Sequence, residues 1–380
     1  MRSSGFRLLL TLGVLTCAAT QAPAQAASWF FAVSGDSRDC GDLIMPKIAR
    51  SIEARRAQAP VAFYWHLGDF RRIFEIDCDM LKRGNPAAEC KAPRAEGAPG
   101  SDAVGRYLDT AWDDFAARQL APFGALPVFL GIGNHELYAG KTRDDFRRKF
   151  QRWLTQEPIH SQRQKDYPSG GTEGETYYHF VRGGVDFISL DNASGAFEAE
   201  QMIWLGRVLA ADAKNDAVRA IVAGMHEALP YSQWRSHAMD RTCAGRCSGQ
   251  AVYDMLFRAA AVGPPEQRKK VHVFASHSHL MAADIYNTPE HAGQVLPGWI
   301  VGTAGAEQYR ENIQYGYLEV EVHPDGTLEP RFVEVGRDAP PLAAGPEAQS
   351  LTEFCFTVNK RPGGAASDRL ETDCACGAVK

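Results

Sequence analysis

The sequence has no apolar run of the roughly 20 residues that a membrane-spanning helix needs. The apolar run at residues 8–19 is too short, follows Arg2 and Arg7, and precedes Ala24-Gln25-Ala26, the small-residue pattern that a signal peptidase reads. We therefore predict that residues 1–26 are a signal peptide, and that the mature chain is periplasmic or secreted and has no transmembrane segment. The alternatives are a buried N-terminal helix and, at Cys17, a lipid-modified cysteine, for which Thr16 is a poor preceding residue.

The sequence also lacks a strong charge of either sign. The formal net charge is −5, and removing the predicted signal peptide with its two arginines would make it −7. Such a chain has no general attraction for nucleic acid or for anionic membranes. The composition, 45% hydrophobic and 23% charged, is that of an ordinary globular protein, and we find no internal repeat. The length allows one large domain or two small ones.

No cysteine pair has a second cysteine or histidine pair at the spacing of a zinc site. Cys17 would leave with the signal peptide, so eight cysteines would remain, an even number. An even number in an exported chain predicts disulfide bonds, although eight cysteines allow 105 pairings. The eight are Cys40, Cys78, Cys90, Cys243, Cys247, Cys355, Cys374 and Cys376.

Short β-rich runs alternate with stretches of helical spacing along the chain. Strands are predicted at residues 29–33, 61–65, 127–130, 177–181, 185–190, 218–223, 271–275, 299–302, 316–322 and 328–335. Helices are predicted at residues 43–52, 106–121, 142–156, 198–212 and 250–261, with a capping box at Thr142 and Asp145.

Two segments interrupt this alternation. Residues 71–105, rich in proline, glycine and alanine, are predicted to be an inserted surface loop, and residues 336–349 to be a linker. The rest of the tail, to residue 380, carries three cysteines and is expected to be tied to the main domain at 27–335, because so short a segment cannot bury a core of its own.

Polar residues follow the ends of five predicted strands, where ligands bind in open α/β sheets. They are Asp36, Asp69, Asn134 with His135, His226, and His277 with His279. This mixture of oxygen and nitrogen donors suits Zn, Mn or Fe ions. A carboxylate can bridge two such ions about 3.5–4 Å apart, an arrangement that serves phosphoryl transfer.

The order and spacing of these residues resemble the calcineurin-like metallophosphoesterases. The resemblance spans about residues 28–335 and rests on Gly68-Asp69, Gly133-Asn134-His135-Glu136, His226 and Ser276-His277-Ser278-His279, where Ser276 replaces a glycine. It implies a four-layer α/β/β/α sandwich, made of two mixed sheets with helices outside. The implied activity is hydrolysis of small phosphomonoesters or phosphodiesters by a metal-bound hydroxide.

The resemblance also implies a role for each matched residue. Asp69 would bridge two metal ions, Fe, Mn or Zn, with Asp36 and His279 at the first ion and Asn134, His226 and His277 at the second. His135 would not bind metal but would protonate the leaving oxygen or stabilise the transition state, and Glu136 would orient His135.

One position departs from the family pattern. The family has D-x-H where this chain has Asp36-Ser37-Arg38, and the tyrosine that the purple acid phosphatases use instead is replaced by Arg72. Arginine cannot bind a metal, so the first site is one ligand short. Water or another side chain could fill the gap, the first ion could bind weakly or be absent, or Arg38 could contact the phosphate and act in catalysis.

Two other functions remain open. The chain could be a phosphate-binding protein on a scaffold that no longer catalyses, or a hydrolase with a single metal ion. His237 is expected to border the site, whereas the histidines outside the motifs are otherwise expected to be structural or exposed. Arg71 and Arg72 could contact substrate or lie in a solvated loop, and Asp191-Asn192 could support the site or form a turn.

Overall fold

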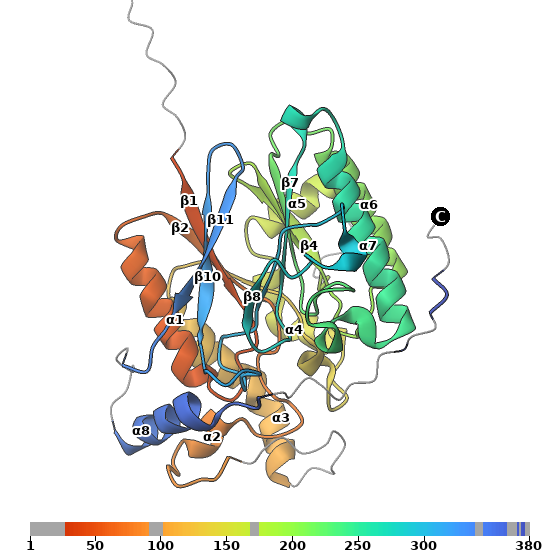
Figure 1. Ribbon diagram of the computed structural model, residues 1–380. Helices are drawn as coiled ribbons and strands as arrows, with labels where there is room; N and C mark the ends of the chain where they lie inside the picture. The colour runs from red at the N-terminus through yellow and green to blue at the C-terminus, as the bar shows by residue number, and fades with distance from the viewer. Residues whose placement is uncertain are drawn as a thin grey trace, which may run out of the picture.

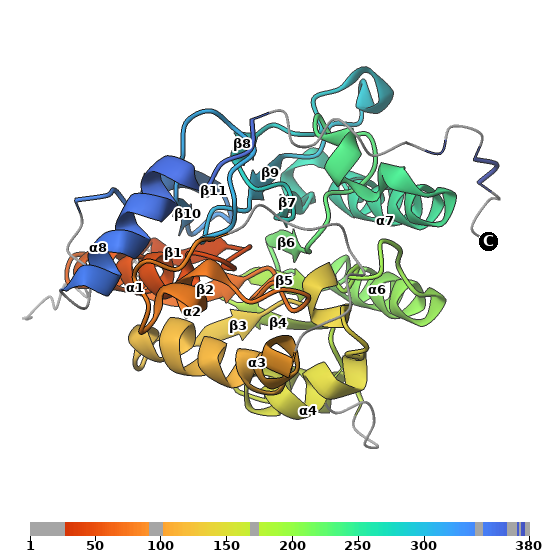
Figure 2. The same cartoon turned by 90° about the horizontal axis from the view of Figure 1, so that it is seen from below.

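The computed structural model describes residues 27–90, 102–167, 175–338, 345–362, 371 and 374–376. The predicted signal peptide, residues 1–26, lies outside this range. Two mixed sheets pack face to face, and helices cover their outer faces (Figures 1 and 2). The predicted four-layer α/β/β/α sandwich is confirmed. Within the residues just given, no helix has the length and apolar character needed to cross a membrane.

The first sheet has the strand order β11-β10-β1-β2-β3. Its strands β1, β2 and β3 are parallel to one another, and β10 runs antiparallel to β1 and β11. Their bounds are β1 Trp29–Ser34, β2 Val61–His66, β3 Val128–Leu130, β10 Gly316–Val322 and β11 Leu328–Glu334.

The second sheet has the strand order β4-β5-β6-β7-β9-β8. The four inner strands are parallel, and the two edge strands β4 and β8 are antiparallel to their neighbours. Their bounds are β4 Tyr178–Arg182, β5 Val185–Ser189, β6 Ala220–Gly224, β7 Lys270–Ala275, β8 Met281–Ala283 and β9 Gly298–Val301.

The outer helices include α1 (Gly41–Arg56) and α4 (Arg143–Leu154), which pack on the first sheet, and α7 (Cys243–Ala261), which packs on the second with α6 (Ala199–Asp212) beside it. The other α-helices described are α2 Cys78–Lys82, α3 Asp102–Phe115, α5 Ile159–Asp166 and α8 Pro346–Glu353. The predicted capping box begins α4: Thr142 Oγ1 accepts from the Asp145 N–H, and the Asp145 carboxylate accepts from the Thr142 N–H.

Phenylalanine rings from both sheets fill the space between them. The ring of Phe187 on β5 meets Phe31 on β1 and Phe63 on β2 edge to face, with ring centroids 5.0 Å apart in both pairs. All three side chains are fully buried. Large rings contribute most of the apolar area of such a core, and the edge-to-face geometry adds to the stabilisation. This rigid interior fixes the strand ends at which the polar residues lie.

The first part of residues 71–105 is not the surface loop that was predicted. Arg71 is fully buried and forms ion pairs with Asp42, Asp79 and Asp114. Arg72 pairs with Asp39, and residues 91–101 lie outside the described part of the chain. Neither arginine is therefore a free cation in a solvated loop. Composition alone does not reveal this, because the three acidic partners of Arg71 come from three separate segments.

The predicted disulfide bonds are confirmed, and four are present. They are Cys40–Cys355, Cys78–Cys90, Cys243–Cys374 and Cys247–Cys376. Three of them tie the C-terminal tail to α7 and to the start of α1, as expected for a segment without a core of its own. Part of the predicted linker at 336–349 is helical, because α8 begins at Pro346, and residues 339–344 lie outside the described residues.

Candidate metal centre

The loops that follow β1, β2, β3, β6 and β7 bring the predicted residues together at the carboxyl ends of these strands. Three of these residues, Asp36, Asp69 and His277, have φ angles of 60°, 60° and 63°. Non-glycine residues rarely adopt this left-handed conformation, and where they do it commonly marks a functional site. The backbone is therefore held in a costly conformation at three of the predicted metal ligands.

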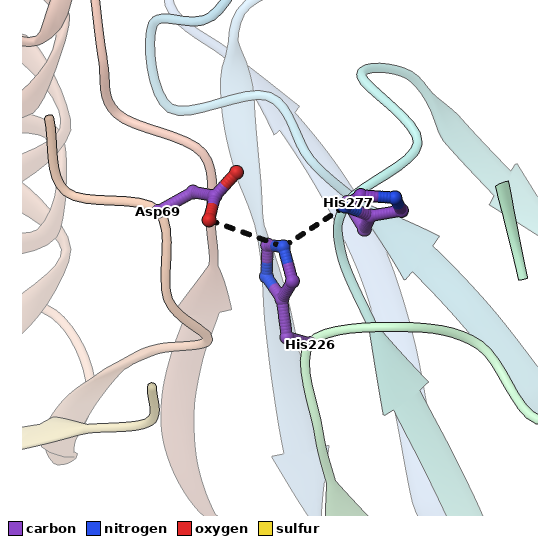
Figure 3. A group of neighbouring side chains, drawn as sticks. All are labelled: Asp69, His226 and His277. Atoms are coloured by element: carbon purple, nitrogen blue, oxygen red, sulfur yellow. Dashed lines mark hydrogen bonds and ion pairs between the residues drawn. The ribbon is translucent and has the colours of Figure 1, made fainter. Parts of the chain in front are cut away.

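Three side chains converge on Nε2 of His226. This atom lies 2.9 Å from Oδ1 of Asn134, 3.2 Å from Oδ1 of Asp69 and 3.0 Å from Nδ1 of His277. Figure 3 shows Asp69 and His277 on either side of the His226 ring. Asp69 and His226 are fully buried. We call Asp69, Asn134, His226 and His277 the second group.

The second group fits a metal ion. Nδ1 of His226 lies 3.1 Å from the Leu67 carbonyl, so Nδ1 keeps its proton and Nε2 is the nitrogen that faces the other ligands. Burial lowers the pKa of His226, but Asp69 outweighs it and raises the pKa to about 9. Burial raises the pKa of Asp69, but His135, His226 and Arg38 lower it well below its usual range. The second group therefore contains an ionised carboxylate, and its charge stabilises a cation bound among these side chains.

Asp36, Asp69 and His279 form the first group, and their ligand atoms lie within 4.8 Å of one another. Oδ1 of Asp36 and Oδ2 of Asp69 are buried without a hydrogen-bond partner. Buried carboxylate oxygens normally have a hydrogen-bond or ionic partner, so both atoms are placed to bind a cation. Oxygen and imidazole donors of this kind suit Zn, Mn or Fe.

The side chain of Arg38 lies among the ligand atoms of the first group. Its Nη2 donates to Nε2 of His279 at 2.8 Å, and its Nη1 contacts the His135 ring and lies 3.8 Å from Oδ2 of Asp69. Burial lowers the pKa of Arg38, but Asp69, Tyr309 and Asp36 outweigh it and raise the pKa above its ordinary value. The guanidinium is thus a permanent cation beside both carboxylates.

His135 and Glu136 differ in their partners. Nδ1 of His135 lies 2.7 Å from the carbonyl of Arg72. The backbone N–H of His135 donates to Oδ1 of Asp69 at 3.0 Å. The Glu136 carboxylate accepts from the backbone N–H groups of Asp69, Phe70 and Gly133 at 2.8–2.9 Å. The Arg72 carbonyl, rather than Glu136 as predicted, holds the His135 ring, and Glu136 joins the loops after β2 and β3.

No protein-family model matches the sequence, and no curated protein matches it. Among solved structures, a purple acid phosphatase from seeds of yellow lupin (Lupinus luteus) aligns with a TM-score of 0.52 and 13% identity, over 94% of this chain and 59% of the lupin chain. The chain thus spans well under two thirds of that enzyme. A structure of PhoD aligns with a TM-score of 0.45 and 14% identity, over 79% of this chain and 65% of that one.

The chain has the calcineurin-like metallophosphoesterase fold. In this metallophosphoesterase fold the predicted motif residues all lie at the expected sheet edge. The likeness is one of fold.

Asn192 supports the candidate metal centre through the backbone of the loop after β6. Its Oδ1 accepts from the backbone N–H groups of His226 and Glu227, and its Nδ2 donates to the Glu227 carbonyl at 2.7 Å. Of the two roles that the sequence left open for Asp191-Asn192, the structure therefore favours support of the site. Asp191 instead pairs with Arg143.

Aromatic rings border the candidate metal centre. Tyr309 stacks on His279 with centroids 4.4 Å apart, and His237 lies 4.8 Å from Tyr309 and 5.3 Å from His277. On the other side, Tyr138 packs against His135 at 4.7 Å. Burial and the nearby His279 lower the pKa of His237 to about 3, so its ring is neutral. The position of His237 agrees with the sequence prediction, whereas no sequence motif pointed to Tyr309 or Tyr138.

Proposed function

We propose that the chain is an exported metal-dependent phosphoesterase that hydrolyses phosphomonoesters or phosphodiesters. The observation that carries the proposal is the convergence of Asp69, Asn134 and His277 on Nε2 of His226, within a phosphoesterase scaffold. Chance rarely brings an acid, an amide and two imidazoles together in a buried site, and structural reasons alone seldom keep them there.

The second group would hold the metal ion, which we expect to be Fe, Mn or Zn. When bound, such an ion polarises a phosphoryl oxygen and lowers the pKa of a water molecule toward neutrality. The chain's own contribution is to keep the ligands preorganised. The Leu67 carbonyl holds the tautomer of His226, and Asn192 holds the loop that carries this histidine.

His135 is proposed to hold or transfer a proton at the leaving oxygen. Its Nδ1 is fixed by the Arg72 carbonyl, so Nε2 is the atom that faces the centre. Burial and the positive charge of Arg38 lower the pKa of His135 well below its usual range. A bound phosphate would add negative charge beside the ring and raise this pKa, so that protonation of Nε2 follows substrate binding.

Four disulfides support the proposed export, because such bonds persist in oxidising compartments such as the periplasm or the cell exterior. We propose residues 27–335 as the catalytic domain and the segment from residue 336 as a tail held by disulfides. The proposed partner is a small phosphoester, and nucleic acid is not expected as a general polyanionic ligand.

The test is an assay of phosphomonoesters and phosphodiesters with added Mn²⁺, Zn²⁺ or Fe²⁺, combined with elemental analysis. We expect metal-dependent hydrolysis, and a fall of at least about 100-fold in Asp69→Asn and His277→Ala. His160→Ala is the matched control, since His160 lies on α5 and its ring bonds to Gln164 on the same helix. Full activity in both site variants would refute the assignment.

A second candidate function is binding of a phosphate ligand without turnover. It is favoured by Arg38, whose buried guanidinium resembles an oxyanion-binding group more than part of a two-metal site. Tight binding of inorganic phosphate without metal, and without turnover of any ester in the same screen, would favour this function over hydrolysis.

A further inference from the structure

The guanidinium of Arg38 lies where the ligand atoms of the first group meet. Nη2 is 2.8 Å from Nε2 of His279, and Nη1 is 3.8 Å from Oδ2 of Asp69. Asp69 belongs to both groups, and its two oxygens face different partners. Its other oxygen, Oδ1, faces Nε2 of His226 in the second group at 3.2 Å. A single carboxylate thus has the arginine on one side and the proposed metal ligands on the other.

The hydrogen bond to His279 uses the lone pair that a metal ion would need. Nδ1 of His279 lies 2.7 Å from the Glu307 carbonyl, which can only accept, so Nδ1 carries the proton. Nε2 then has one lone pair, and Arg38 donates to it. One lone pair cannot serve a guanidinium and a metal ion at the same time.

Charge leads to the same conclusion. Asp36 and Asp69 are fully buried and need a nearby positive charge. Arg38 supplies it and cannot release its proton under ordinary conditions. A divalent ion in the first group would lie within a few ångströms of this cation and be repelled by it. In the second group the ion would be screened from Arg38 by the Asp69 carboxylate.

The backbone fixes Arg38 in this position. The N–H groups of Asp36 and Ser37 donate to the carbonyls of Gly68 and Asp69, both at 3.0 Å. Two residues after Arg38, Cys40 is bonded to Cys355. The Arg38 side chain is only 13% exposed. The arginine is therefore built into the centre and is not a surface side chain that has folded over it.

We infer that Arg38 takes the place of a metal ion in the first group, so that the centre binds one ion, in the second group. The inference rests on the proposed function, because it requires the second group to bind metal. The guanidinium then provides a fixed positive charge and N–H donors beside the bound ion. A phosphate oxygen in contact with the ion would have this cation as its second electrophilic neighbour.

The experiment measures metal content rather than activity. Full-length chain is equilibrated with Mn²⁺ by dialysis, the bound metal is measured by elemental analysis, and the electron paramagnetic resonance spectrum distinguishes an isolated Mn²⁺ from a coupled pair. We expect one Mn²⁺ with an isolated-ion spectrum in the wild type. Arg38→His removes the cation and adds an imidazole, and should bind two ions with a coupled spectrum.

Arg361→His is the matched control. Arg361 lies 5.6 Å from the Tyr309 ring and is exposed, so this variant adds a histidine near the centre but leaves the first group intact. It should bind one ion. Two ions in the wild type, or one ion in a folded Arg38→His, would overturn the inference and leave the proposed function standing. No bound metal in the wild type would overturn both, and the wild-type measurement decides even where the variant fails to fold.

Discussion

Oε2 of Glu136 accepts a hydrogen bond from the backbone N–H of Asp69 at 2.8 Å. A residue in the loop after β3 thereby fixes the loop after β2, in which Asp69 has a φ angle of 60°. The same carboxylate accepts from Phe70 and Gly133. Three donors on one carboxylate offset the cost of the left-handed backbone at Asp69, which is on the order of 1–3 kcal/mol.

Glu136→Gln tests this relationship. The glutamine amide keeps one accepting oxygen but turns its NH₂ group toward at least one backbone N–H. Two hydrogen-bond donors then face each other, and that hydrogen bond is lost. We expect the free energy of unfolding to fall by about 1–3 kcal/mol, and metal-dependent hydrolysis to fall roughly 10–100-fold. Urea unfolding and steady-state kinetics measure the two effects. Glu334→Gln on exposed β11 is the control, and a Glu136 variant that behaves like it would contradict the interpretation.

Arg71→Met should strongly destabilise the fold. The variant leaves Asp42, Asp79 and Asp114 near one another without the buried cation that they share. Removing one side of a buried ion pair costs about 3–5 kcal/mol, and urea unfolding measures this cost.

Arg83 provides the comparison for Arg71, because it pairs with the same Asp42 and Asp114 but is 34% exposed. Exposed ion pairs contribute about 1 kcal/mol or less, so Arg83→Ala should change the free energy of unfolding by no more than that. Equal losses of unfolding free energy in the Arg71 and Arg83 variants would show that the burial of Arg71 does not determine its contribution to stability.

Loss of Cys40–Cys355 should cost more than loss of Cys78–Cys90. The two bonds span 315 and 12 residues. Chain entropy assigns about 6 and about 3 kcal/mol to loops of these lengths, and these are upper values when other crosslinks remain. The measurement is the free energy of unfolding of the two double Cys→Ser variants.

Hydrolysis should also separate these two variants. Asn359, four residues after Cys355, donates to the carbonyl of Gly305, and its carbonyl accepts from the N–H of Gln308. This contact supports the loop that places Tyr309 against His279. We expect kcat/KM to fall in the Cys40/Cys355 variant and to be unchanged in the Cys78/Cys90 variant. The opposite order would show that the tail does not support the site.

Stability should depend on pH through His179. Burial lowers the pKa of this histidine, but Asp186 and Asp166, each 2.8 Å from a ring nitrogen, raise it to about 10. An unfolded histidine titrates near 6.5, so the folded chain keeps a proton that the unfolded chain loses. The stabilisation is therefore complete below about pH 6.5 and is lost as the pH rises toward 10.

The expected loss over this interval is on the order of 3 kcal/mol in the free energy of unfolding. Chemical unfolding at pH 6, 8 and 10 measures it. His179→Gln should be less stable than the wild type at pH 6 and should lose less stability between pH 6 and 10, with the remaining slope due to groups such as His226. His160→Gln should keep the wild-type slope, because the His160 ring pairs with Gln164 on α5 and not with a carboxylate. A wild-type chain that gains stability between pH 6.5 and 9 would contradict the assignment.

The layers of the fold were predicted from the resemblance of the motifs to a known family, since the alternation of strands and helices also fits other α/β folds. The strand ends indicated where the candidate site lies. Strand ends carry the signal, because a hydrophobic run followed by Gly-Asp or Gly-Asn-His places a polar side chain at the sheet edge whatever the distant loops do. Asp69, Asn134 and His226 were predicted in this way, and their side chains meet. The capping box at Thr142 depends on neighbours three residues apart and was equally accessible.

Contacts between distant segments could not be predicted from the sequence. Arg71 and Glu136 were misjudged because their partners are backbone groups or acids from other loops, and no local spacing encodes those partners. Tyr309 was missed because it lies in a loop between β9 and β10 that carries no motif. The disulfides were predicted as a class, but their pairing depends on where the tail docks.

Three of the four disulfides have one cysteine between residues 355 and 376, near the end of the chain. The ribosome makes these cysteines after residues 27–335, so none of the three bonds can close while that segment is still being synthesised. Of the four bonds, a product that stops before Cys355 can form only Cys78–Cys90. Closure of the other three therefore marks a chain that extends through Cys376, and a thiol-reactive probe would distinguish such a chain from products that stop earlier.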